Sequence, residues 1–248
     1  MIVEFIGSSG AGKTTLISQV QRKLADITDV TTSFDLVASQ LGLRHVTHPT
    51  ARNLIQEFVG FPYLIQSLHR HKAFIGFILR MLARQANFSI FTLNNLRSLE
   101  RKIGVYEIIR RRSHNRIVLV DEGTVLLAHN IFVYSEAAYT REEIARFASL
   151  VPLPDVIVYI KASMDILVQR SLNRTDAPRE MRSKDRAVIE SYINRAVRMF
   201  DDLIKADNIQ RRLLIIENSD RNGHGSDLAV NDIVGFILDC HPSGTSIP

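Results

Sequence analysis

The sequence predicts an α/β fold in which a five-stranded parallel sheet is flanked by helices, and three observations carry this prediction. Short runs rich in Val and Ile recur along the 248 residues, and they are almost continuously apolar, as in strands that are covered on both faces. Stretches with helical spacing separate these runs, which favours right-handed crossovers between parallel strands. A glycine-rich loop follows the first run and precedes a helical pattern.

The predicted strands are Ile2–Ile6, 30–34, Ile117–Val120, 156–160 and 213–216, of which the second is the weakest candidate. Glu4 interrupts the first strand. Helices are expected over residues 14–24 and about 184–206, where apolar residues recur on one face. Thr140 and Glu143 predict a capping box, and Ser163 and Ser226 are candidate caps of two further helices.

Residues 53–112 carry no strand signal and many helix formers, so we expect two or three helices inserted between the second and third strands. One interpretation is a helical layer that covers the sheet, and another is a lobe that binds substrate. Contact with a membrane surface is a third alternative, because the segment is both apolar and basic. The whole chain, residues 1–248, is predicted to be a single domain.

Composition restricts the class of protein further. Lys and Arg total 31 against 26 Asp and Glu, and the net charge of +5 suggests an anionic partner. Cys240 is the one cysteine, which excludes an internal disulfide and favours a reducing, cytoplasmic location. No targeting segment is visible, and the most apolar window, 73–82, is interrupted by Arg80 and falls short of the roughly 20 residues that span a bilayer.

Residues 7–14, Gly-Ser-Ser-Gly-Ala-Gly-Lys-Thr, fit the pattern G-x-x-x-x-G-K-[ST] of a phosphate-binding loop. Its glycines let successive N–H groups point at phosphate oxygens, and the next helix aims its positive end at the same anion. Lys13 is expected to reach the β- and γ-phosphates of ATP, and the Thr14 hydroxyl to ligate Mg²⁺. The motif specifies the fold as a three-layer P-loop NTPase fold. The predicted nucleotide-binding residues are Ser8, Ser9, Gly10, Ala11, Gly12, Lys13, Thr14, Thr15 and Arg170.

Two acids follow the predicted third strand. Asp121 and Glu122 come directly after four apolar residues, which places them at the carboxyl end of a buried strand, where open α/β sheets bind ligands. Asp121 is expected to hold Mg²⁺ with Thr14, and Glu122 to orient or deprotonate a nucleophile. The sequence leaves open which carboxylate takes which role.

A basic segment precedes the long predicted helix. Its members are Arg170, Arg174, Arg179, Arg182, Lys184 and Arg186, with Pro178 among them. Arg170 and Arg174 are four apart and are expected on one helix face. Arginines on a lid at about 173–184 could close over a triphosphate and neutralise charge on the transferred group. The alternative is a solvated basic surface.

The order of these features resembles the thymidylate-kinase-like group of nucleoside and nucleotide kinases. Residues 158–163, with Arg170 and Arg174, are similar to the strand and helix that lead into the lid of that family. The resemblance implies transfer of the γ-phosphoryl group of ATP to a small acceptor, with Mg²⁺, lid arginines and a carboxylate near the acceptor. It places Lys13 and Thr14 in the loop, Asp121 at the acid after the third strand and Arg174 in the lid. It covers most of the chain outside residues 40–115.

Three departures argue against thymidylate as the acceptor. Glu122 stands where the family usually has arginine, the loop lacks the Asp-Gly form, and only Asp35 offers a carboxylate after the second strand. The sequence therefore predicts a divergent kinase for a nucleoside, nucleotide or related small molecule. Its expected catalytic residues are Lys13, Asp121, Glu122, Arg174 and Arg179.

The alternative function is a P-loop ATPase that hydrolyses ATP to drive a protein or nucleic-acid partner, which the adjacent Asp121 and Glu122 favour. Direct binding of nucleic acid is not expected, because the basic stretch from Arg97 to Arg112 contains only one aromatic residue, Tyr106. The motifs leave the oligomeric state open, with a homodimer as one alternative.

Overall fold

The sheet has five parallel strands in the order β2-β3-β1-β4-β5. The computed structural model describes residues 1–43, 46, 48–84, 90–113, 115–134, 139–174, 185–218 and 227–241. The strands are β1 (Ile2–Ile6), β2 (Val30–Thr32), β3 (Ile117–Val120), β4 (Val156–Lys161) and β5 (Leu213–Glu217). All pairs in this sheet are parallel, which confirms the predicted fold class.

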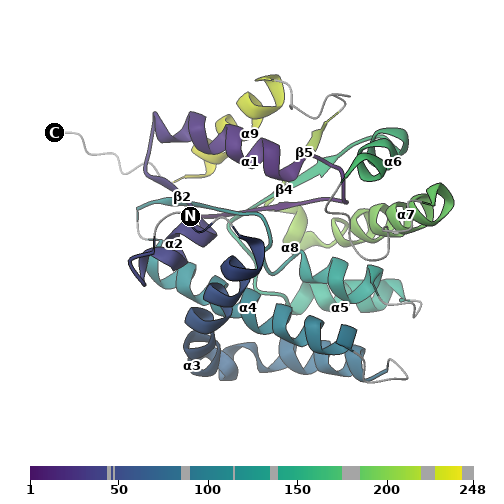
Figure 1. Ribbon diagram of the computed structural model, residues 1–248, viewed down its shortest axis with the longest axis horizontal. Helices are drawn as coiled ribbons and strands as arrows, with labels where there is room; N and C mark the ends of the chain where they lie inside the picture. Colours follow the sequence, from purple (N-terminus) through teal and green to yellow (C-terminus); the bar gives the residue numbers. More distant parts are fainter. Residues whose placement is uncertain are drawn as a thin grey trace.

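Helices cover both faces of this sheet and create the predicted three layers (Figure 1). They are α1 (Lys13–Ala25), α2 (Ser33–Ser39), α3 (Pro49–Ala83), α4 (Ile90–Arg112), the π-helix η1 (His129–Val133), α5 (Arg141–Leu150), α6 (Met164–Asn173), α7 (Arg186–Leu203), α8 (Asp207–Gln210) and α9 (Asp227–Cys240). In the view of Figure 1, α1 and α9 lie above the sheet, and α3, α4, α5 and α7 lie below it. Because both faces are covered, every residue of β1 and β3 is buried, as their continuous apolar runs predicted.

Local sequence signals explain where several elements begin and end. β2 is shorter than the predicted 30–34, because the Thr32 side chain accepts a hydrogen bond from the Asp35 N–H at 3.1 Å and so begins α2. The capping box of Thr140 and Glu143 is present at the start of α5. Ser163 occupies the N-cap position of α6, although its side chain makes no capping hydrogen bond within the described chain. Ser226 lies outside the described residues.

The insertion consists of two long helices, α3 and α4, and it begins at Pro49 rather than at the predicted residue 53. On α4, Val105 and Ile108 pack against Ile2 and Val118 of the sheet, so the insertion does cover a face of it. The helices approach so closely that a Cβ on Gly104 would lie 2.5 Å from the carbonyl oxygen of Gly60. None of the described helices, including the 35-residue α3, combines the length and apolarity needed to cross a membrane.

An ion-pair network joins the middle of α3 to the C-terminal part of α4. Glu107 is fully buried and accepts hydrogen bonds from Arg70 and Arg110, each at 3.0 Å, while the His71 Nε2 lies 2.9 Å away. Burial by itself raises the pKa of Glu107, but the hydrogen bonds from Arg110, His71 and Arg70 outweigh it and lower the pKa to about 2. Part of the basic stretch after Arg97 therefore neutralises a buried carboxylate.

Candidate functional site

The glycine-rich loop leads from β1 into α1 with the curled backbone that its sequence predicts. Gly7, Gly10 and Gly12 all have positive φ, and Gly12, at φ 92°, is the N-cap of α1. A Cβ on Gly7 would lie 2.5 Å from the carbonyl oxygen of Ile160, so only glycine fits there. The loop N–H groups and the start of α1 therefore form a ready site for an anion.

Three side chains from later parts of the chain hold this loop in place. Arg170 Nη1 donates to the carbonyl oxygen of Gly10 at 2.9 Å, and Arg174 Nη1 donates to Ser9 Oγ at 3.2 Å. Asn218, buried directly after β5, donates to the carbonyl oxygen of Ala11 at 2.8 Å. Sequence reasoning missed Asn218, for which the available signal was a polar residue at the carboxyl end of a strand.

Arg170 and Arg174 do not share one helix face, contrary to the prediction from the sequence. Arg174 follows the last residue of α6 in an extended conformation, so it does not share a helix face with Arg170. Arg174 lines the cavity beside the loop, whereas Arg170 binds the loop backbone. Arg179, Arg182 and the rest of the segment 175–184 lie outside the described residues.

Lys13 and Thr14 occupy the mouth of the loop. Lys13 Nζ donates to the carbonyl oxygens of Gly7 at 2.8 Å and Ser8 at 3.2 Å. Burial lowers the pKa of Lys13, and the carboxylates of Asp121 and Glu122 act in the opposite direction. The predicted residue Thr15 is exposed and is not among the residues that line the cavity.

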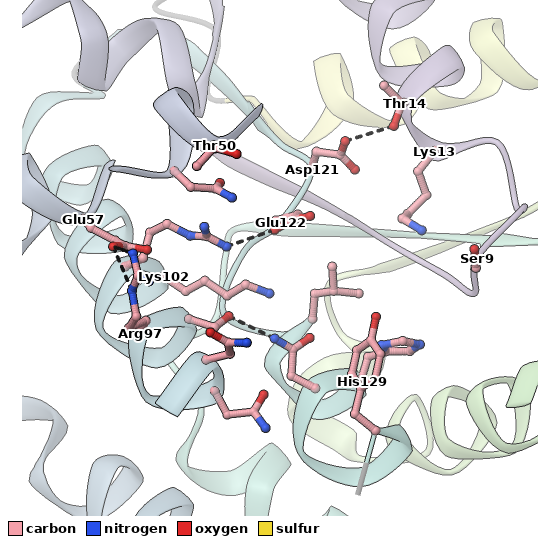
Figure 2. Close-up of a pocket in the computed structure, with 18 of the residues that line it drawn as sticks. Ser9, Lys13, Thr14, Thr50, Glu57, Arg97, Lys102, Asp121, Glu122 and His129 are labelled. Carbon is pink, nitrogen blue, oxygen red and sulfur yellow. Dashed lines mark hydrogen bonds and ion pairs between the residues drawn. The ribbon is translucent and has the colours of Figure 1, made fainter. Parts of the chain in front are cut away.

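The two acids after β3 point to different partners. Asp121 Oδ2 accepts a hydrogen bond from Thr14 Oγ1 at 3.1 Å, and Glu122 Oε2 lies 3.3 Å from Arg101 Nη2 of α4. Burial would raise the pKa of Glu122, but the positive charges of Lys102 and Arg101 outweigh it and lower that pKa. Glu122 is thus held as a carboxylate at neutral pH, and it lies between Asp121 and the residues of α4 (Figure 2).

The oxygen atoms of Thr14 and Asp121 suit a hard cation such as Mg²⁺, which needs only one or two protein ligands beside water and phosphate. Within the described ranges, no group of three or more His, Cys, Asp or Glu side chains could hold a metal ion. A magnesium site built from these two residues and a bound nucleotide therefore fits the donor set.

The loop and the insertion enclose a cavity of about 670 Å³ between them. Figure 2 shows Lys13, Thr14 and Asp121 on one side, Arg97 and Lys102 on the other, and Glu122 between them. The sequence analysis allowed a substrate-binding lobe in this insertion but named none of the residues of the α4 wall. Its cavity-lining members are Asn94, Asn95, Arg97, Ser98, Arg101 and Lys102, and Asn53, Asn130 and His129 line it from other elements.

The buried carboxylate of Glu4, on β1, binds the backbone of the segment that follows Glu122. Its oxygens accept hydrogen bonds from the N–H groups of Leu126 at 2.9 Å and Val125 at 3.2 Å. A Cβ on Gly123 would lie 2.3 Å from this carboxylate. Burial raises the pKa of Glu4 to about 7, although these N–H groups and Lys102 oppose the shift.

We expect Glu4→Gln to remove part of the pH dependence of stability. The raised pKa means that the native state binds more protons than the unfolded state between about pH 4.5 and 7, so the free energy of unfolding falls as pH rises through that window. At ~1.4 kcal/mol per pKa unit, Glu4 accounts for about 3 kcal/mol of this fall. Urea unfolding at half-unit pH steps measures the slope, with the exposed Glu217→Gln as control. An equal slope in Glu4→Gln and the unchanged protein would contradict the assignment.

The fold and the loop together define a P-loop α/β protein. No protein-family model matches the chain, and comparison with curated proteins finds no match. Among solved structures, the chain is similar to a thymidylate kinase from Ehrlichia chaffeensis, with 14% identity and a TM-score of 0.49 over 96% of this chain and 98% of that one. It is also similar to a shikimate kinase from Acinetobacter baumannii in complex with shikimate, with 17% identity and a TM-score of 0.41 over 96% and 93% of the two chains. Both of these neighbours are kinases.

Proposed function

We propose that the chain is a kinase that transfers the γ-phosphoryl group of ATP to a hydroxyl group of a small acceptor. The observation that carries this proposal is the cavity, in which a phosphate-binding loop and a polar helical wall face each other across Glu122. An enzyme that only hydrolyses ATP needs room for a water molecule beside the phosphate-binding loop. This cavity also has the α4 wall, whose amide, hydroxyl and cationic groups can bind a second substrate.

The acceptor oxygen forms a bond to the γ-phosphorus, the bond from that phosphorus to the β–γ bridging oxygen breaks, and ADP leaves. Glu122 orients the acceptor hydroxyl and receives its proton. Lys13, with Arg174 beside the loop, binds the phosphate oxygens and stabilises the charge that develops on them.

Thr14 and Asp121 would hold Mg²⁺, as their hydrogen bond brings both oxygens to one place. The metal, when bound, neutralises phosphate charge. Arg170 and Asn218 act through the loop, because they fix the backbone carbonyls of Gly10 and Ala11. The lid role of Arg179 stays a prediction.

ADP release in the presence of MgATP tests the function. We expect release to rise when a small hydroxyl-bearing acceptor is added, with one phosphorylated acceptor formed per ADP. The panel comprises nucleosides, nucleoside monophosphates, sugars and sugar acids. ADP formed at the same rate without acceptor, and stimulated only by nucleic acid or by a protein, would support the ATPase alternative instead.

The roles of the two acids are separable by Glu122→Gln and Asp121→Asn. We expect Glu122→Gln to lower kcat by about 100-fold or more with little change in the Mg²⁺ requirement, because a positioned base contributes ~10²–10⁴-fold. Asp121→Asn should shift the Mg²⁺ titration of activity to higher concentrations. The reverse pattern, with the Mg²⁺ shift in Glu122→Gln, would exchange the two assignments.

A further inference from the structure

One face of α4 forms the wall of the cavity that faces the phosphate-binding loop. Arg101 and Lys102 each lie three or four residues after Ser98, and Ser98 lies four after Asn94, so the four side chains share this face. Asn130, beyond β3, donates from Nδ2 to Ser98 Oγ at 2.9 Å and extends the wall. The wall therefore offers hydrogen-bonding groups over several helical turns.

Lys102 is the charged group on this wall with hydrogen-bonding capacity to spare. Its side chain belongs to a residue only 3% exposed, and Figure 2 shows it reaching from α4 toward the middle of the cavity. Within the described part of the chain its ammonium makes no hydrogen bond and no close ion pair, although Glu122 and Glu4 attract it from farther away. An ammonium has three donors, and because Lys102 lines the cavity these donors are available to a ligand there.

The other two cations of the wall already have partners. Arg97 binds Glu57 of α3, with Nη2 to Oε2 at 2.7 Å, and Arg101 lies 3.3 Å from Glu122. Lys13 and Arg174 belong to the nucleotide side of the cavity. Lys102 is therefore the group placed to bind a negative charge on the acceptor.

The rest of the wall suits hydroxyl groups. Asn95 is 4% exposed, lines the cavity, and its Nδ2 has no hydrogen-bond partner among the described residues. Amide side chains both donate and accept, which matches the hydroxyls of a polyol. Four asparagines line this cavity in the described chain, namely Asn53, Asn94, Asn95 and Asn130.

The cavity shows no open aromatic slot for a base in the part of the chain that the structure describes. The rings that line it belong to His129, Tyr134 and Tyr192, and they pack on one another. His129 also stacks on Phe200 at 5.9 Å between ring centres. These rings thus form one cluster with each other and with Phe200, which favours packing within the protein over a slot for a nucleobase.

Resting on the proposed kinase function, we propose that the acceptor is a small polyhydroxylated acid, a sugar or polyol that carries one carboxylate or phosphate group. Lys102 binds the acidic group, the asparagines bind hydroxyls, and Glu122 faces the hydroxyl that is phosphorylated. This assignment gives Lys102 a binding role and not a role in the chemical step.

Matched acceptor pairs test the proposal. With MgATP, D-gluconate is compared with D-glucose, and D-ribose 5-phosphate with D-ribose, while thymidine and thymidine monophosphate represent nucleosides. We expect kcat/KM to be about tenfold or more higher for the acid of at least one pair, because a charge-assisted hydrogen bond to Lys102 should strengthen binding of the acid by about that factor. The carboxylate and phosphate arms distinguish the two sources of charge.

Lys102→Met should abolish this preference, because only the acid loses a charge-assisted hydrogen bond. Since the charge of Lys102 also lowers the pKa of Glu122, the ratio of kcat/KM between acid and neutral partner is the measurement, and not the rate of either one. Lys102→Arg should keep the preference, and the exposed Lys72→Met on α3 is the matched control. Circular dichroism checks that each variant folds. If Lys102→Met does not fold, the acid preference of the unchanged protein tests the proposal by itself, and equal kcat/KM for the acid and the neutral member of both pairs would contradict it.

The outcomes separate the inference from the function on which it rests. Phosphorylation of thymidine or its monophosphate, with neither acid accepted, would overturn the inference and leave the kinase standing. ADP formed with no phosphorylated product from any member of the panel would count against the kinase itself. An unchanged acid preference in folded Lys102→Met would overturn the role of Lys102.

Discussion

Replacing Lys13 with alanine is expected to lower ATP-dependent phosphoryl transfer by about 100- to 1,000-fold, the effect typical of removing one preorganised donor to transition-state charge. Lys13 Nζ already lies within the curve of the loop, bonded to the carbonyl oxygens of Gly7 and Ser8. A nucleotide phosphate at the start of α1 would exchange these neutral acceptors for charged ones. Other described side chains that bond to the loop contact different atoms of it, namely the Gly10 and Ala11 carbonyl oxygens and Ser9 Oγ.

The measurement is the rate of ADP formation with saturating acceptor, together with the affinity for a fluorescent ATP analogue. Lys23→Ala is the matched control, since Lys23 is an exposed lysine on the same helix that contacts Asn231. We expect Lys23→Ala to stay within about twofold of the unchanged protein, as surface substitutions usually do. Turnover of Lys13→Ala within about tenfold of the unchanged protein would place the nucleotide elsewhere.

The loop side of the site was predictable because its motif is local in sequence and Asp121 directly follows a buried strand. The motif joins Gly7, Lys13 and Thr14 within eight residues, and a buried strand delivers Asp121 to the adjacent edge of the sheet. β1 pairs directly with β3, so the carboxyl ends of both strands meet. Periodicity and one motif therefore suffice to predict this half of the geometry.

A substrate-binding lobe was one interpretation of residues 53–112, but the individual residues of the α4 wall were not predictable, because nothing local marks them. Lys102 follows Arg101 in a stretch that has the composition of an exposed basic surface. Which face of α4 is buried depends on how α3 and the sheet pack against it, and that is a tertiary property. Asn95 of α4 and Asn130 of η1 are far apart in sequence, and they line one cavity only because the fold brings the two helices together.

Several of the basic residues that give the chain its positive net charge pair with acidic side chains, which composition does not show. Arg110 and Arg70 neutralise the buried Glu107, Arg97 pairs with Glu57, and Arg101 lies beside Glu122. Much of the stretch between Arg97 and Arg112 thus serves the packing of the insertion.

Replacing Gly104 with alanine is expected to lower the free energy of unfolding by about 3 kcal/mol or more, at the upper end of what overpacking costs. The new Cβ would lie 2.5 Å from the carbonyl oxygen of Gly60 and 2.7 Å from its Cα. These are backbone atoms of a neighbouring helix, and they cannot turn aside as a side chain can. The two helices would have to separate.

Gly76→Ala in α3 is the matched control, because a Cβ there meets nothing within 4 Å. Alanine favours a helix by up to about 1 kcal/mol over glycine, so this variant should be neutral or slightly stabilised. Urea unfolding followed by circular dichroism gives both values. A loss below about 1 kcal/mol in Gly104→Ala would contradict the close crossing of α3 and α4.

The same substitution should also separate the two halves of the site. Lys102 precedes Gly104 by two residues on α4, whereas the phosphate-binding loop belongs to β1 and α1. If α4 shifts, the acceptor wall moves and the loop does not. In folded Gly104→Ala we therefore expect a higher KM for the acceptor and an unchanged affinity for the fluorescent ATP analogue. Equal losses of both would mean that the insertion and the loop act as one unit, and that the acceptor site does not depend separately on the position of α4.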